Sequence, residues 1–249
     1  MKRSVLLVLI LLLIAPLSHS QLWKMRRWEV MGGIGPSFFF GDIGGYSQTK
    51  NLLGFRDLSY LQTRYDLNGN IKYRLSRDFN ARLSLTYGNL HATDVRGSNE
   101  GRDYEASTSI FEPSLLAEYY FIKNRAESSY LFLKGNYNFI PGLLRSLDLY
   151  AFTGIGGVAY SVKGNDALMI DPGFVKNGFD LTLPLGVGAT LIYSPNINFG
   201  LELAGRYAFT DFIDGYTSQY SKANDVYYFL NFTVTYKLKT GPKGWPSFR

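Results

Sequence analysis

The chain has 249 residues, a formal net charge of +6 and no cysteine, so it is not a disulfide-stabilised scaffold. Aromatic residues make up 16% of the chain and charged residues only 18%, which is below the usual quarter for a globular domain. The net charge alone is compatible with nucleic acid, a membrane surface or an acidic protein as partner.

The first twenty residues have the composition of an export signal. Met1, Lys2 and Arg3 form a short cationic start, residues 5–15 are apolar, and residues 18–20 include small residues at the expected cleavage point. A membrane-spanning helix needs about 20 apolar residues, so this run is too short to be one. We therefore expect residues 1–20 to be a cleaved signal peptide. Because the chain is exported, we do not expect nucleic acid as a partner.

The remaining chain is dominated by alternation of apolar and polar residues, which has the period of a β-strand. In residues 64–75, apolar side chains occupy the odd positions and polar or charged ones the even positions. Short turns at Ser76 and Ser194 join two pairs of such segments into hairpins. Residues 147–161 are apolar on both faces and rich in glycine, so their register stays open. The eight predicted strands are 28–40, 64–75, 79–87, 107–121, 147–161, 179–193, 197–209 and 226–238.

Strands of about 10 to 13 residues are longer than most soluble strands and suit a tilted bilayer crossing. Only a closed barrel satisfies every backbone hydrogen bond in lipid, and eight is an even number of the kind that bacterial outer-membrane barrels use. We predict an all-β chain with an eight-stranded antiparallel transmembrane β-barrel in residues 21–239 and a periplasmic tail in residues 240–249. The alternative, a soluble barrel with its charges outward, needs a polar outer face that the first and fifth strands lack.

The orientation follows from the strand ends. Aromatic residues gather at both ends of the predicted strands, as Tyr73 and Tyr236 do at one end and Tyr87 and Tyr207 at the other, which is typical of two interfacial belts. Eight strands place both termini on one side, and short turns are typical of the periplasmic side. The segments 41–63, 91–105, 162–178 and 211–225 are then expected to be outside.

If the apolar faces contact lipid, the charged faces meet in the lumen. A small barrel has room there for little more than its own side chains. Six basic and six acidic side chains face the lumen in this interpretation. This balance favours a lumen filled with ion pairs over an ion-selective pore, which displays one sign of charge. The predicted lumen network consists of Arg64, Lys72, Arg74, Arg82, Arg206 and Lys237 with Glu29, Asp66, Glu112, Glu118, Asp180 and Glu202.

We predict no enzyme activity, no cofactor and no metal site. After the expected cleavage, His91 is the only histidine, and it lies three residues before Asp94. A Ser-His-acid site also needs a nucleophile beside the histidine, which the sequence does not identify. Asp211, Asp214 and Asp225 could hold a calcium ion between them, but their spacing matches no calcium-binding loop.

The periplasmic segments are strongly basic, with eleven Lys and Arg residues against only Asp78 and Glu127. This excess favours contact with an acidic protein or with anionic lipid headgroups. The connection 123–145 is long and apolar, which is typical of a loop with a function. The predicted partner-binding residues are Arg26, Arg27, Lys123, Arg125, Lys134, Arg145 and Lys243.

Residues 40–43 (Phe-Gly-Asp-Ile), the hairpin 64–87, and Arg102 leading to Phe111-Glu112 follow one another in a recognisable order. With Gly88, Asp94 and Glu118, they resemble the small outer-membrane barrels typified by PorG of type IX secretion. The resemblance implies a non-enzymatic component that ties a periplasmic ring, formed by a lipoprotein and its partner, to the outer membrane. The connection 123–145 and the basic residues would then be docking surfaces. The alternative is an adhesin-like or general structural barrel that acts through its extracellular loops.

Overall fold

The computed structural model describes residues 26–44, 60–95, 100–123, 141, 144–217, 224–241 and 244–247. The predicted signal peptide and the candidate partner-binding residues Arg125, Lys134 and Lys243 lie outside these ranges. Within them, no helix has the length and apolar composition needed to cross a membrane. The elements are β1 (Trp28–Phe40), β2 (Arg64–Arg74), β3 (Phe79–Thr93), η3 (Glu100–Arg102), β4 (Glu105–Ile122), β5 (Leu147–Gly164), α3 (Asp166–Met169), β6 (Asn177–Ile192), β7 (Ile197–Ala208), β8 (Val226–Thr240) and β9 (Pro246–Ser247).

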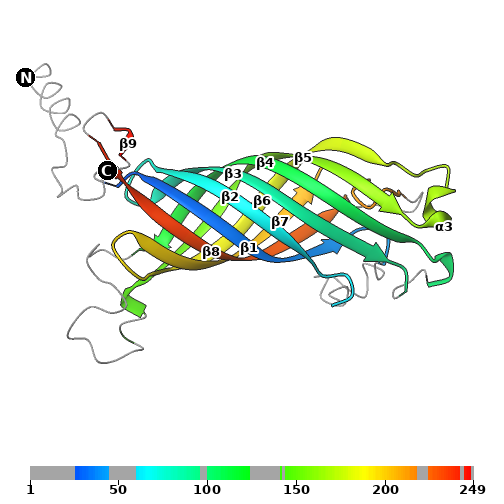
Figure 1. The fold of residues 1–249 in the computed structure, drawn as a ribbon, viewed down its shortest axis with the longest axis horizontal. Coiled ribbons are helices and arrows are strands. Elements are labelled where there is room, and N and C mark those ends of the chain that lie inside the picture. The colour runs from blue at the N-terminus through cyan, green and yellow to red at the C-terminus, as the bar shows by residue number, and fades with distance from the viewer. Residues whose placement is uncertain are drawn as a thin grey trace, which may run out of the picture.

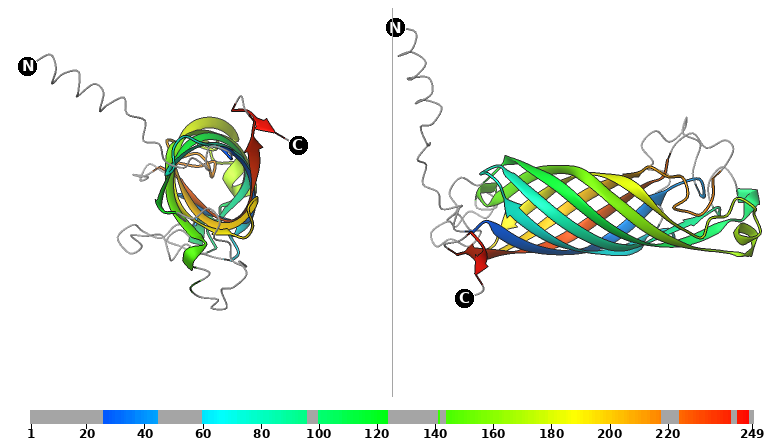
Figure 2. Two further views of the ribbon diagram at one scale, coloured as in Figure 1. Left: turned by 90° about the vertical axis from the view of Figure 1, so that its left-hand side faces the viewer. Right: turned by 90° about the horizontal axis from the view of Figure 1, so that it is seen from above.

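The eight long strands form a closed antiparallel barrel. Each pairs with its neighbours in the sequence, and β1 also pairs with β8, so that the sheet has no free long edge. The strands are strongly tilted in Figure 1, and the view along the axis in Figure 2 shows the closed ring. The predicted fold class is therefore confirmed.

Several strands are longer than the sequence pattern predicted. β4 and β5 have 18 residues each, and β3 continues to Thr93 instead of ending at Tyr87. Backbone pairing continues there, with Thr93 opposite Glu105 and Ala106 opposite Gly164. In these extensions the outward positions are polar, as at Glu105 and Lys163, whereas the inward Leu90, Ala106 and Val162 are apolar and buried. The direction of the alternation is therefore reversed relative to the rest of the wall.

The side chains are arranged with apolar groups outside and charged groups inside. On the outer face, Leu83 is 51% exposed and Leu185 is 63% exposed, whereas Lys72 and Glu118, on the inner face, are almost fully buried. A barrel in water would leave its charges outside and bury its leucines. This arrangement contradicts the soluble alternative and is the one that a barrel surrounded by lipid requires.

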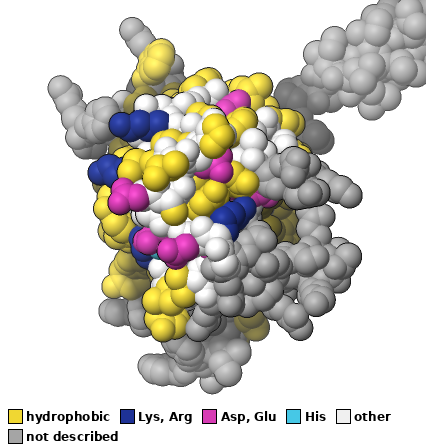
Figure 3. All heavy atoms as spheres, turned by 90° about the vertical axis from the view of Figure 1, so that its right-hand side faces the viewer, with side chains coloured by type: hydrophobic (Ala, Val, Ile, Leu, Met, Phe, Trp, Pro, Cys, Tyr) yellow, Lys and Arg dark blue, Asp and Glu magenta, His cyan; other side chains and the backbone are white. Residues whose placement is uncertain are grey.

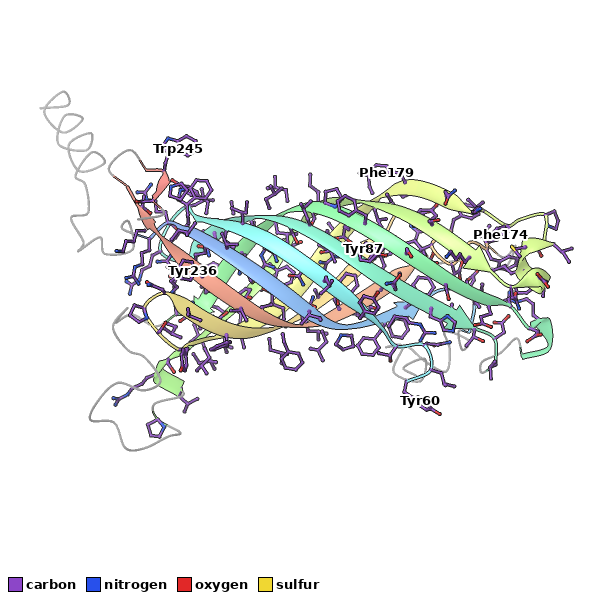
Figure 4. All side chains as sticks on the ribbon, in the orientation of Figure 1. Tyr60, Tyr87, Phe174, Phe179, Tyr236 and Trp245 are labelled. Atoms are coloured by element: carbon purple, nitrogen blue, oxygen red, sulfur yellow. The ribbon has the colours of Figure 1, made fainter. Side chains whose placement is uncertain are left out.

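The two ends of the barrel differ. One end, which we call the terminal end, carries Arg26, the strand β9 and the short connections 75–78 and 193–196. The opposite end, which we call the loop end, carries α3 and the connections that follow β1, β3, β5 and β7 (Figure 1). Tyr236 lies toward the terminal end and Phe179 toward the loop end, both on the outer face (Figure 4). The indole of Trp28 donates a hydrogen bond to the Gly244 carbonyl (3.0 Å), which holds the chain after β8 against the terminal end.

Candidate functional site

The centre of the lumen is occupied by an ion-pair network around Arg82. Its guanidinium donates to both carboxylate oxygens of Glu202, at 2.9 and 2.7 Å, and also contacts Glu118. Lys72 pairs with Glu118 at 2.9 Å. All four side chains are buried. Because each charge has a partner of opposite sign, the network avoids the large cost of an isolated buried ion.

Aromatic rings surround these charges, and sequence reasoning missed them. The Tyr150 hydroxyl donates to Glu202, and the Lys72 ammonium lies 5.0 Å from the centre of the Tyr150 ring. The Arg82 guanidinium lies 4.7 Å from the ring of Phe152, a distance at which the ring stabilises a cation. β5 is apolar on both faces. The alternation of odd and even positions therefore did not reveal that Tyr150 and Phe152 point inward.

The remaining predicted lumen residues fall into smaller groups. Arg206 pairs with Glu112 at 2.8 Å, and Arg74 pairs with Glu29 at 3.2 Å. Asp66 is also buried. Arg64, Asp180 and Lys237 are only partly buried: Arg64 donates to the Leu61 and Thr63 carbonyls, Asp180 accepts from Tyr160, and Lys237 lies 3.2 Å from the reoriented amide of Asn198.

The loop end is held together by buried carboxylates, which we call the loop-end cap: Asp94 with Arg102, and Asp214 with Asp225. Asp94 accepts from Arg102 Nε (2.7 Å) and from the Gly44 amide (2.8 Å). The Arg102 guanidinium lies 4.7 and 4.8 Å from the ring centres of Tyr104 and Tyr216. A hydrogen bond to Asp171 raises the pKa of Tyr104 to about 12. In Figure 3, acidic and basic side chains lie among hydrophobic ones on this end.

Asp214 and Asp225 are the other buried acids of the loop-end cap. Asp214 accepts from the amides of Ile43 (3.1 Å) and Tyr216 (3.0 Å), and Asp225 accepts from Ile213 (2.8 Å). Burial raises the pKa of Asp214 to about 7. Burial and the neighbouring Asp214 raise the pKa of Asp225 well above its ordinary value. Within the described ranges, no group of three or more acidic or histidine side chains is arranged to hold a metal ion.

His91 lies on the outer face of the wall near the loop end, beyond the outer aromatic residues. Its partner is not Asp94, which binds Arg102. His91 Nδ1 lies 3.0 Å from Ser107 Oγ, and Nε2 lies 3.7 Å from Glu105 Oε1. Burial and the Arg64 guanidinium lower the pKa of His91. Sequence reasoning missed Ser107 and Glu105 because their proximity depends on the register between β3 and β4.

The described candidate partner-binding residues gather at the terminal end. Arg26 contacts the Pro195 carbonyl, Arg27 donates to the Tyr73 hydroxyl (3.1 Å), and Lys123 donates to the Arg77 carbonyl (2.6 Å). Arg145 is exposed. Burial and the nearby Arg74 lower the pKa of Lys123 to about 8.

No protein-family model matches the chain, and a search of curated proteins finds no match. Solved structures of small outer-membrane barrels align with it. Neisserial surface protein A has 11% identity and a TM-score of 0.46, covering 84% of this chain and 96% of its own. OprG of Pseudomonas aeruginosa has 11% identity and a TM-score of 0.46, covering 87% and 97%. A major outer membrane protein of Thermus thermophilus has 13% identity and a TM-score of 0.44, covering 84% and 99%. Their activities are not carried over to this chain.

Proposed function

We propose that the protein is an outer-membrane barrel that anchors a periplasmic component of a secretion machine, as the resemblance to PorG-like barrels implies; this anchoring role itself requires no enzyme activity. In this proposal both termini lie in the periplasm, the apolar wall contacts outer-membrane lipids, and the partner is a periplasmic protein or lipoprotein. The observation that carries the proposal is the concentration of cations at the terminal end, where Arg26, Arg27, Lys123 and Arg145 lie together with the short turns.

The chemistry of this end favours an acidic partner. A surface with an excess of one charge raises the local concentration of the opposite charge and steers its approach. Burial, Arg74 and Lys237 lower the pKa of Lys123, while the nearby carboxylates of Glu29 and Asp148 raise it. A further carboxylate on a partner would add to the attraction of these cations at physiological pH, when Arg26, Arg27 and Arg145 are charged.

The test is co-purification from the native membrane with a Lys123→Ser/Arg145→Ser variant. The expected result is weaker recovery of a periplasmic protein with the barrel, while the barrel still reaches the membrane. The matched control is Lys163→Ser/Lys176→Ser, which removes the same charge from exposed residues toward the loop end. Equal recovery with the wild type and both variants would contradict the anchoring role.

A second function, surface interaction through the extracellular loops, is favoured by the exposed apolar tip of the loop end. There Ile170 is 81% exposed, directly after α3. In the same experiment, loss of a partner only in an Ile170→Ser variant would identify this function instead.

A further inference from the structure

A polar cluster lies on the outer face of the wall at the loop end of β3, β4 and β5. The strand register places His91 directly opposite Ser107, and Ser107 directly opposite Lys163. Glu105 occupies the next position of β4 on the same face. Four chemically different groups therefore lie on three adjacent strands, outside the lumen network and outside the loop-end cap.

The geometry of the cluster is that of an acid, a base and a nucleophile in series. Glu105 Oε1 lies 3.7 Å from His91 Nε2, and His91 Nδ1 lies 3.0 Å from Ser107 Oγ. A proton on Nε2 is attracted by the carboxylate, which leaves Nδ1 free to accept the proton of the serine hydroxyl. This is the arrangement by which a serine becomes a nucleophile.

A cation is within reach of the reacting centre. Side chains directly opposite each other on neighbouring antiparallel strands have Cβ atoms about 5 Å apart, which places the flexible Lys163 beside Ser107. An ammonium group at this position can stabilise the negative oxygen that forms when a serine attacks a carbonyl group. Lys163 and Ser107 are both exposed, so a substrate can approach them.

The height of the cluster indicates the class of substrate. The pair Tyr87 and Phe111 forms part of the outer aromatic row, and His91 and Ser107 follow four residues further along the same strands. Four residues correspond to about 13 Å along a strand, and about 10 Å along the membrane normal at the usual tilt. The aromatic row marks the level of the lipid headgroups, so the cluster lies at the outer edge of the headgroup layer, where it can meet an ester carried on the polar part of an amphiphile whose chains lie against the apolar wall.

We propose that Ser107, His91 and Glu105 form an esterase site on the outer wall of the barrel, which cleaves carboxylic esters of amphiphiles in the outer leaflet. Ser107 Oγ bonds to the ester carbonyl carbon while its proton moves to His91 Nδ1. The carbon–oxygen bond to the leaving alcohol then breaks, and the alcohol takes the proton from His91. Water next attacks the acyl-serine, giving its proton to His91 and then to Ser107, and releases the carboxylic acid. The overall reaction consumes one ester and one water. It is independent of the periplasmic anchoring proposed above.

The test uses the purified barrel in detergent micelles with p-nitrophenyl decanoate and a fluorophosphonate probe, which labels activated serines covalently. We expect the wild type to hydrolyse the ester and to be labelled. Ser107→Ala and His91→Gln should both lose labelling and lose hydrolysis on the order of 10³-fold. The matched control is Ser109→Ala, two residues away on the same face, where the hydroxyl donates to Asn89 instead (2.9 Å).

The positioning role of Glu105 has its own readout. Glu105→Gln removes the negative charge beside His91, so the acid limb of the pH–rate profile should move to lower pH as the rate falls about tenfold. An unchanged limb would remove Glu105 from the site. A folded wild-type barrel that neither hydrolyses the ester nor reacts with the probe overturns the proposal, as does full labelling of Ser107→Ala. Folding of each variant is checked by circular dichroism.

Discussion

Replacing Asp214 by asparagine tests how a buried carboxyl group makes the stability of the loop-end cap depend on pH. In the wild type, Asp214 accepts two backbone hydrogen bonds and has its pKa raised from 3.8 to about 7. The folded cap therefore holds a proton that the opened cap releases between about pH 4 and 7. Stability contributed by the protonated form is fully present below pH 4 and is lost as the pH rises through about 7. Above pH 7 the loss is about 4 kcal/mol.

Asparagine does not titrate, so Asp214→Asn removes the contribution of Asp214 to this pH dependence and leaves that of Asp225, which the wild type shares. Its amide has only one acceptor oxygen, so one of the two backbone hydrogen bonds is lost at a cost of about 1 kcal/mol. The variant cap should be less stable than the wild type at pH 4 by that amount. At pH 8 it should be more stable by about 3 kcal/mol, which is about a hundredfold in an opening equilibrium.

The assay is hydrogen–deuterium exchange of the Ile43 and Tyr216 amides, expressed as protection factors so that the intrinsic pH dependence of exchange is removed. We expect the curves of the wild type and of Asp214→Asn to cross between pH 4 and 8. The control, Asp171→Asn, removes a partly buried acid whose pKa is lowered by the Gly173 amide and the Tyr104 hydroxyl, so it should show no such crossing. Parallel curves for the wild type and Asp214→Asn would refute the reasoning.

Two further predictions concern the barrel itself. Arg82→Met leaves two buried carboxylates with too little positive charge and should lower the free energy of unfolding by about 3 to 5 kcal/mol, measured by urea denaturation in micelles; an unchanged midpoint would contradict the importance of the network. Gly154→Ala places a Cβ against the Leu115 carbonyl and should cost about 1 to 3 kcal/mol. Its control is Gly69→Ala, where nothing lies within 4 Å of the added Cβ, and equal effects of the two substitutions would contradict the packing argument.

The fold was predictable because one face of each strand contacts an apolar environment and the other a polar one. Apolar and polar residues therefore alternate along the sequence. β5 was the exception, because its inner face carries Tyr150 and Phe152 rather than charges. Strand ends were less predictable, since polar residues such as His91 and Glu105 continue the ladder without continuing the apolar alternation.

The inward direction of Arg82 and Glu202 followed from the parity of their positions, but their contact did not. They are 120 residues apart, and their proximity depends on how the closed ring brings β3 across from β7. The contact between Ile43 and Asp214 was likewise not predictable: their hydrogen bond joins the segment after β1 to the connection between β7 and β8. Sequence periodicity gives the direction of each side chain, whereas the partner depends on the shear and closure of the barrel.

The ion pair of Arg82 with Glu202 crosses the bore from β3 to β7, while its pair with Glu118 joins β3 to the neighbouring strand β4. A barrel braced in this way resists flattening of its cross-section, so its wall deforms less under load. Tension applied at one mouth is then transmitted along the axis to the opposite mouth instead of being absorbed by bending of the wall. In the proposed anchoring role, the internal charges would supply the stiffness with which the barrel holds a periplasmic assembly.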